Sequence, residues 1–304
     1  MFTVVRSRFL ALRPRVRAVL YMMVMVLLFA MLETIAKYLS GFYPVPMIAW
    51  GRYSVHLLLM LVLFAPRMGT RLLRTTQPGA QILRASLLMG STLFAFSALS
   101  YLPMAEVKAI NFISPLLVTI FAAWLLGETV NRARWVAVAT GFFGVLFIVR
   151  PGSGMLQWQA ALPLASALFY SLYQIMTRKF SEREQPLTTL FYSALVGCAV
   201  MTLALPLFWK LPALRHVPLF VLLGTGAGLG HFMLIKAMEL ENASFLSPLV
   251  YTQLVWVMLA GFIVFGDLPD SRAFIGMAII VASGLYVALG HRFRAKEFPE
   301  TPID

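Results

Sequence analysis

The sequence predicts an all-α membrane protein of ten transmembrane helices, arranged as two inverted five-helix repeats. Three observations support this fold class: the composition, the length of the apolar runs, and a repeat within the chain. The 304 residues are 60% hydrophobic and only 12% charged, with a mean hydropathy of +0.83. An ordinary soluble domain is about half apolar and about a quarter charged, so this composition is that of an integral membrane protein.

The apolar runs have the length of membrane-crossing helices. Lipid offers the backbone no hydrogen-bond partners, and runs of about 20 residues without strict alternation fit helices. The basic start could pass for a signal peptide, but the first run continues to residue 39 without an A-x-A-like cleavage site, so we expect it to be retained. We expect spans near residues 18–39, 45–65, 80–100, 103–126, 133–149, 157–177, 187–208, 217–238, 243–265 and 272–290.

The basic residues predict the orientation of these spans. Eighteen of the 25 Lys and Arg residues fall at the two termini or in the connections that follow the even-numbered spans, with Arg84 counted just beyond one of them. By the positive-inside rule these segments are cytoplasmic, so the net charge of +13 requires no nucleic-acid partner. We expect a basic cytoplasmic segment at 1–17, repeats at 18–152 and 153–290, and a cytoplasmic tail at 291–304.

The chain repeats itself at an offset of 139 or 140 residues. "FAMLETIAKYLSGFYPVPMIAWGRYS" (29–54) aligns without gaps on residues 169–194, and "LLGETV" (125–130) matches "VFGDLP" (264–269). Five spans per repeat is an odd number, so the second repeat enters the membrane from the opposite face. Inverted repeats are typical of transporters that work by alternating access around a site between the repeats. A duplicated scaffold without transport is the alternative.

Several segments resemble the EamA-type branch of the drug/metabolite transporter superfamily. The resemblance is carried by "ALSYLPMAEVKAINFISPLLVTIFAAWLLGETVNRARWVAVATGFFGVLFIVRPG" (98–152), "WGRY" (50–53) and "FLSPLVYTQLVWVMLAGFIVFGDLPD" (245–270). It implies ten helices in a bacterial inner membrane and a cavity lined mainly by helices 1, 3, 4, 6, 8 and 9. The family moves small organic metabolites, inward or outward. The chain departs from the pattern in "GDLPD" and in having Leu254 where the first repeat has Pro115.

Charged residues inside spans are the first site candidates, because a charge there costs about 2.5–3.5 kcal/mol on insertion scales. The predicted orientation places five of them in the periplasmic third of the first repeat: Glu33, Lys37, Arg52, Glu106 and Lys108. The matching positions of the second repeat are uncharged: Tyr173, Thr177, Tyr192, Phe245 and Ser247. Packing of the five-helix unit therefore does not require these charges, which favours a special role.

Each candidate has a chemical role and a structural alternative. Arg52 suits bidentate pairing with a substrate carboxylate, or a structural tie to Glu33 or Glu106. Glu106 could carry a coupling proton, or it could serve the dipole of the helix that begins there. His56 is a second proton-carrying candidate, or a satisfied interhelical histidine.

The remaining candidates are polar rather than catalytic. Glu33 and Lys37 have the spacing of an ion pair within one helix. Lys108 and Asn111 share a face, and Asn111 is a candidate contact in the cavity wall. In the second repeat the substrate-binding candidates are Tyr173, Gln174 and His231, with Tyr170, Tyr251 and Gln253 as further polar residues. Glu128 and Asp267 are expected to cap helices.

These patterns predict a secondary transporter of a small organic metabolite. The mixed charges favour export of an amino-acid-like or carboxylated solute, including an amino-acid-derived metallophore. The alternative is import of a vitamin or nucleoside-like compound such as riboflavin or S-adenosylmethionine. An enzyme is not expected, since the chain has no H-E-x-x-H, no G-x-S-x-G and one cysteine. We expect neither cofactor nor metal, and the sequence leaves monomer and homodimer open.

Overall fold

The computed structural model describes residues 12–127, 130, 132–149, 158–180, 184–241, 246 and 249–295. All regular secondary structure within these ranges is helical. Seven helical segments are long and apolar enough to cross a membrane, and three shorter apolar helices coincide with the fifth, ninth and tenth predicted spans. The predicted fold class is therefore confirmed. Most of the predicted terminal segments, together with Glu128, Phe245 and Ser247, lie outside the described residues.

The helices follow the predicted spans closely. The first repeat contains α2 (Pro14–Ser40), α3 (Val45–Met68), α4 (Pro78–Tyr101), α5 (Met104–Asn111), α6 (Ser114–Leu126) and α7 (Arg132–Val149). The second contains α8 (Ala161–Phe180), α9 (Pro186–Ala204), α10 (Val217–Met238), α12 (Gln253–Ala260), a π-helix (Gly261–Phe265) and α13 (Ser271–Ala295). Proline starts several of these helices, where its missing N–H is not needed.

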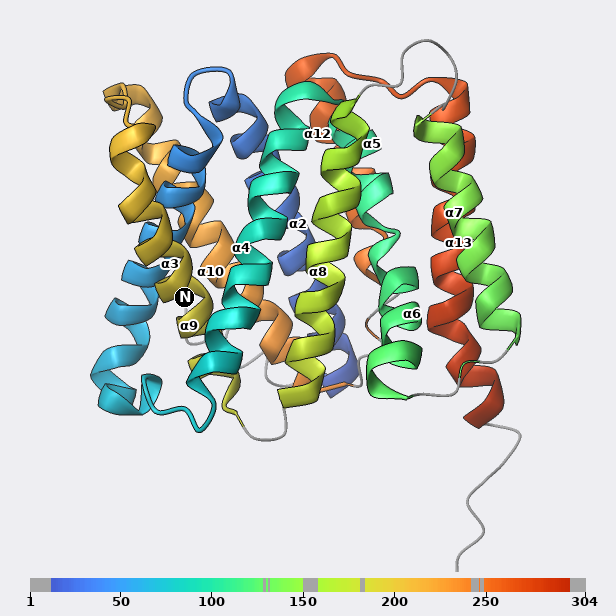
Figure 1. Cartoon of the computed structure of the whole chain (residues 1–304), viewed down its shortest axis with the longest axis horizontal. Helices are drawn as coiled ribbons and strands as arrows, with labels where there is room; N and C mark the ends of the chain where they lie inside the picture. Colours follow the sequence, from blue (N-terminus) through green and yellow to red (C-terminus); the bar gives the residue numbers. More distant parts are fainter. Residues whose placement is uncertain are drawn as a thin grey trace, which may run out of the picture.

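Helices of the two repeats pack between one another, and equivalent helices make equivalent contacts. Figure 1 shows α8 of the second repeat lying between α4 and α6 of the first. The first helix of each repeat packs on the third helix of the other, α2 on α10 and α8 on α4. The same device allows both contacts: a Cβ on Gly230 would lie 2.5 Å from the Phe29 ring, and one on Gly90 would lie 2.6 Å from the Phe169 ring. These two pairs are 140 residues apart, so the repeat in sequence is a repeat in packing.

The fourth helix of each repeat is interrupted at matching positions. The α-helix breaks at residues 112–113 and at residues 251–252, which are 139 residues apart. Phe112 and Tyr251 meet edge to face, with ring centroids 4.9 Å apart. The second repeat breaks without a proline at the position that matches Pro115, so the break belongs to the repeat rather than to proline. Interrupted helices at corresponding positions of two repeats are a feature of secondary transporters.

One end of the bundle is closed by apolar packing. A large buried cluster gathers the end of α2, the starts of α3 and α10, the end of α4, the start of α5, and α12. Leu39, Met47 and Met104 are within 1% of complete burial there. We call this the sealed end; it is the upper edge of the bundle in Figure 1, where α5 and α12 are labelled.

Candidate functional site

A cavity of about 610 Å³ opens at the end of the bundle opposite the sealed end. This volume lies within the range of about 300–1,000 Å³ that is usual for small-molecule sites. Its walls come from α4, α8, α9 and α10 and the connections beside them. Helices 3, 6 and 8 were expected to line the cavity, whereas helix 7 was not. Helices 1, 4 and 9 were also expected, but none of the described lining residues comes from them. The lining residues are Gln77, Ala80, Gln81, Arg84, Tyr170, Tyr173, Gln174, Thr177, Glu184, Pro186, Thr189, Leu190, His231, Leu234, Ile235, Met238 and Glu239.

Arg84 is the cation of this cavity. It lies in the second turn of α4 and is only 2% exposed. Its Nη2 donates to Oε1 of Gln81 at 2.9 Å and also to the Thr189 carbonyl and the Ser193 hydroxyl of α9. Within the described part of the chain, no carboxylate lies within ion-pair distance of this guanidinium. A buried cation held by neutral groups retains the capacity to bind an anionic or strongly accepting group of a ligand.

The sequence interpretation of Arg84 was incomplete. It was counted with the topology-setting arginines of the preceding connection, although it is the fifth residue of the predicted span at 80–100. The position within that span was the available signal. Three arginines of a short loop precede Arg84, so the sequence also fits a topology-setting role for it, and that role was assigned.

Gln81 connects Arg84 to Glu184 at the cavity mouth. Its Nε2 donates to Oε2 of Glu184 at 3.2 Å, while its Oε1 accepts from Arg84. The other carboxylate oxygen accepts from the hydroxyls of Thr75 and Thr76 and from the Thr76 amide. Partial burial raises the pKa of Glu184, but the hydrogen bonds from Thr75, Thr76 and Gln81 outweigh it and leave the pKa below its ordinary value. Glu184 thereby ties the connection before α4 to the one before α9.

Acidification is expected to weaken this tie. Because the pKa of folded Glu184 is depressed, its contribution to stability is present above the ordinary glutamate pKa of about 4.3 and is lost as the pH falls through the folded value. The melting temperature of the wild type should therefore fall more steeply below about pH 4.3 than that of Glu184→Gln. Thermal unfolding in detergent from pH 7 to pH 3 measures this difference; parallel curves would contradict it.

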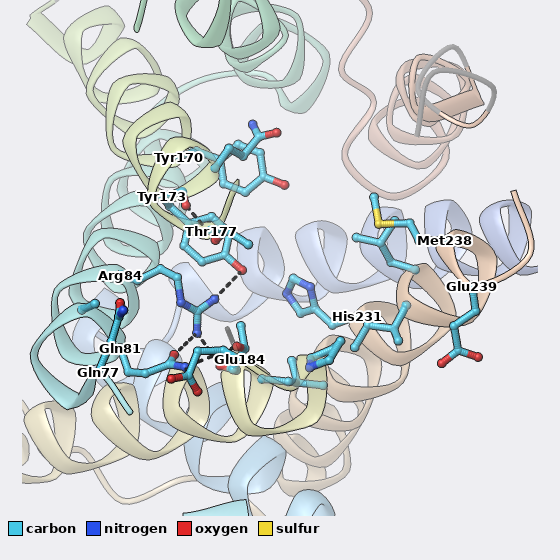
Figure 2. A pocket seen from close by; sticks show the side chains of 17 residues that line it. Gln77, Gln81, Arg84, Tyr170, Tyr173, Thr177, Glu184, His231, Met238 and Glu239 are labelled. Atoms are coloured by element: carbon cyan, nitrogen blue, oxygen red, sulfur yellow. Dashed lines mark hydrogen bonds between the residues drawn. The ribbon is translucent and has the colours of Figure 1, made fainter. Parts of the chain in front are cut away.

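Two tyrosines form an aromatic wall beside Arg84. Tyr170 and Tyr173 of α8 stack with ring centroids 5.8 Å apart and ring planes 25° apart. The Tyr173 ring lies over the guanidinium of Arg84, with Cζ 5.3 Å from its centroid. Figure 2 shows Arg84 and His231 directed into the space beside these rings, from α4 and α10 respectively. Tyr173, Gln174 and His231, all predicted from the sequence, thus lie together.

A second set of polar side chains, His56 and Arg52, lies on α3 near His231. The His56 ring stacks on His231 with centroids 6.4 Å apart and planes 12° apart. Arg52 is 6% exposed; it donates to the Thr92 hydroxyl and lies over the Tyr53 ring. The predicted tie from Arg52 to Glu33 or Glu106 is therefore wrong. Buried His56 Nε2 and Arg52 Nε have no hydrogen-bond partner among the described residues.

Glycines of α10 allow this close approach. A Cβ on Gly228 would lie 3.0 Å from Cδ2 of His56, and one on Gly224 would lie 2.4 Å from Cβ of Val55. The glycines of the "GTGAGLG" segment (224–230) thus permit close packing of α10 on α3.

Three of the other predicted charges form ion pairs at the sealed end: Glu33, Lys37 and Lys108. Lys108 Nζ contacts Oε1 of Glu33 at 2.7 Å, and the Gln253 amide donates to the same oxygen at 3.3 Å. Lys37 pairs with Asp267 and also donates to the Leu102 carbonyl at 3.1 Å. The predicted pair between Glu33 and Lys37 is therefore wrong, because each finds a nearer partner on another helix or connection.

Three further residues predicted from the sequence are Asp267, Glu106 and Asn111. Asp267 does not cap α13; the Ala273 amide donates instead to Oδ1 of Asp270 at 2.8 Å. Glu106 is half-buried in the first turn of α5, and Asn111 is the last residue of α5, directly before the helix break. Neither Glu106 nor Asn111 lines the described cavity.

The described residues form seven long and three shorter apolar helices in two inverted repeats, sealed at one end and hollow at the other, which is the architecture of secondary transporters. The chain belongs to the EamA-like transporter family, whose sequence model matches residues 16–150 and 157–289. It is accordingly a multi-pass membrane transporter with a small-molecule substrate and a lipid environment.

Relatives within this family carry different solutes. A riboflavin transporter of Vibrio cholerae is 33% identical over 88% of this chain and 91% of the relative. An S-adenosylmethionine uptake transporter of Rickettsia bellii is 30% identical over 75% and 79%. A pseudopaline exporter of Pseudomonas aeruginosa is 28% identical over 84% and 90%. One crystal structure, at 24% identity, matches with a TM-score of 0.66 over 89% of this chain and 96% of the other, which supports the fold.

Proposed function

We propose that this protein imports a planar heteroaromatic metabolite of the flavin or nucleoside class across the bacterial inner membrane. The observation that carries the proposal is the stacked pair Tyr170 and Tyr173 beside the buried guanidinium of Arg84. Aromatic side chains bind flat ring systems by stacking, and a guanidinium fork suits carbonyl or anionic oxygens at the edge of such a ring. Gln81, Gln174 and His231 add hydrogen-bonding groups around the same space.

The charge of the cavity argues against a zwitterionic solute. An amino acid needs an acceptor for its ammonium group, but four donors already occupy the roughly four acceptor positions of the Glu184 carboxylate, and Glu239 already has a cationic partner. Glu184 accepts bonds from Thr75, Thr76 and Gln81, and Glu239 pairs with Lys236 at 2.7 Å. The mixed charges that favoured amino-acid export lie at the sealed end. The cationic group of S-adenosylmethionine would lack a partner for the same reason, so a flavin-like solute is favoured.

The direction of transport is proposed from the relatives. The Rickettsia protein is an uptake transporter, and the Vibrio protein carries riboflavin. With the predicted orientation, the cavity faces the cytoplasm and is the release state of an importer. We place both termini in the cytoplasm on the same basis.

Export of a carboxylated metabolite is the second candidate. The guanidinium of Arg84 faces no carboxylate within ion-pair distance among the described residues, so it could equally hold a solute carboxylate. The exporter from Pseudomonas aeruginosa is the relative that favours this alternative.

Transport into sealed proteoliposomes tests the proposal. Purified protein should exchange labelled riboflavin saturably, with no chemical change to the solute, and protein-free vesicles should not. Saturable flux of a carboxylated amino-acid derivative, with no flavin or nucleoside flux, would support the second candidate and exclude the first.

The aromatic wall makes a sharper prediction within that assay. Tyr173→Leu should raise KM for the flavin about two- to twelve-fold, because stacking contributes about 0.5–1.5 kcal/mol. Tyr173→Phe keeps the ring and should remain within about two-fold of the wild type, since the Tyr173 hydroxyl lies 3.4 Å from Arg84 and makes only a weak bond. Tyr101→Leu, at the sealed end, is the control. Equal KM for the Leu and Phe variants would argue against stacking.

A further inference from the structure

A second pocket lies at the sealed end, on the outside of the bundle. It has a volume of about 470 Å³ and is formed by the end of α2, the short 3₁₀ turn Leu214–His216, the start of α10 and the π-helix. Its lining residues are Thr34, Ile35, Tyr38, Arg215, His216, Leu219 and Val264. It shares no lining residue with the cavity described above.

His216 presents a buried nitrogen without a partner at this pocket. The residue is 3% exposed, and its Nε2 has no hydrogen-bond partner in the part of the chain that the structure describes. Its Nδ1 lies 2.8 Å from the Tyr43 hydroxyl, which also accepts the Ala213 amide at 2.9 Å. In the tautomer in which the Tyr43 hydroxyl donates to Nδ1, the neutral ring carries its proton on Nε2. An unpaired buried donor of this kind requires an acceptor.

Two further positive features face the same pocket. Arg215 lines it, is exposed, and has no hydrogen-bond or ion-pair partner among the described residues. The amino-terminal end of α10, a helix of 22 residues, begins at Val217, and this end of a helix carries a partial positive charge. The orphan donor, the guanidinium and the helix end together fit an anionic group with several acceptor oxygens.

The surroundings of the pocket are those of a membrane interface. Tyr38 and Phe42 contact the His216 ring at centroid distances of 5.8 and 4.7 Å. Trp50 and Trp209 meet edge to face at 6.0 Å at the same end of the bundle. Aromatic residues of this kind gather at the level of the lipid headgroups. Exposed apolar residues continue from the pocket along the π-helix and α10: Val264, Ile263, Val221 and Leu222.

We propose that this pocket binds the phosphodiester headgroup of a phospholipid. The phosphate oxygens accept from Nε2 of His216 and from the guanidinium of Arg215, and the acyl chains follow the apolar surface of α10 and the π-helix. With the predicted orientation, the lipid belongs to the outer leaflet. The site is separate from the solute cavity and does not depend on which solute is carried.

Native mass spectrometry of the purified protein tests this site. Phosphatidylglycerol should bind about ten-fold more tightly than diacylglycerol with the same acyl chains, because only the former has the phosphate. Arg215→Gln and His216→Asn should each weaken phosphatidylglycerol binding about three- to ten-fold. Asn keeps an acceptor for Tyr43 and removes the donor at the Nε2 position. Arg272→Gln makes the same charge change on an exposed arginine outside the pocket and should have no effect.

Two results would overturn the proposal. Equal binding of diacylglycerol and phosphatidylglycerol would mean that the apolar surface holds acyl chains without phosphate recognition. Displacement of the lipid by millimolar inorganic phosphate would assign the pocket to free phosphate-bearing solutes instead. Melting temperatures of both variants near the wild-type value show that a loss of lipid binding is not a loss of fold.

Discussion

Replacing Arg84 with glutamine is expected to lower kcat/KM for solute transport about 100-fold while the protein stays in the membrane. The guanidinium is the charged donor of the cavity. Losing a hydrogen bond between this charged group and the solute costs about 1.5–3 kcal/mol. Arg84 also bonds the Thr189 carbonyl of α9, so the variant loses a contact that shapes the cavity wall. Flux of labelled solute in proteoliposomes measures the loss.

Two controls separate recognition by Arg84 from a purely structural role. Arg71→Gln removes an exposed arginine from the connection before α4 and should transport normally. For a solute analogue that lacks the oxygen acceptors at the ring edge, flux by the wild type and by Arg84→Gln should differ far less than for the parent solute. If the variant loses all flux for both solutes, or keeps full flux for the parent solute, Arg84 does not recognise that edge.

Replacing Asp267 with asparagine is expected to open the sealed end about ten times more readily. Lys37 joins α2 to the connection after the π-helix through Asp267, and to the end of the third helix through the Leu102 carbonyl. The Lys37 and Asp267 side chains are 16% and 31% exposed, so the pair is only partly screened by water. Losing a partner of such a pair removes roughly 1–2 kcal/mol from the closed state. A state in which the sealed end is open must break this contact, because the contact joins the two repeats.

Thiol accessibility measures that opening. In a Cys198→Ser background, a cysteine at Ala98, which is fully buried in the sealed end, should react faster with a membrane-impermeant reagent when Asp267→Asn or Lys37→Met is present. Glu241→Gln removes the exposed pair with Arg15 at the other end and is the matched control. Unchanged modification rates in both sealed-end variants would show that apolar packing closes this end without the ion pair.

The spans and the repeat could be predicted from the sequence because lipid constrains each segment separately. A membrane-crossing helix must satisfy its own backbone and be apolar along its length, and neither requirement depends on its neighbours. The offset between the repeats likewise follows from local similarity. It correctly matched residues 112–113 with 251–252, where the structure breaks the fourth helix of each repeat.

The partners of the charged residues could not be predicted in this way. Glu33 and Lys37 have the spacing of an ion pair on one helix, but Lys108 and Asp267 come closer from other segments. Charges in a low-dielectric interior pair with the nearest opposite charge, and which one is nearest depends on how the helices pack. Arg84 was misread for a related reason, since its burial depends on α9 packing over the start of α4.

The sequence by itself determined the ten apolar segments, their family and the inverted relation of the two halves. Only the tertiary structure decided where the repeated positions act. Glu33 and Lys37 match Tyr173 and Thr177 in sequence. The inversion places the two charged residues at the sealed end and the two uncharged residues in the cavity wall. The physical reason is that a closed end requires contacts between the repeats, while a cavity requires their separation. Both depend on packing between helices that lie far apart in the chain.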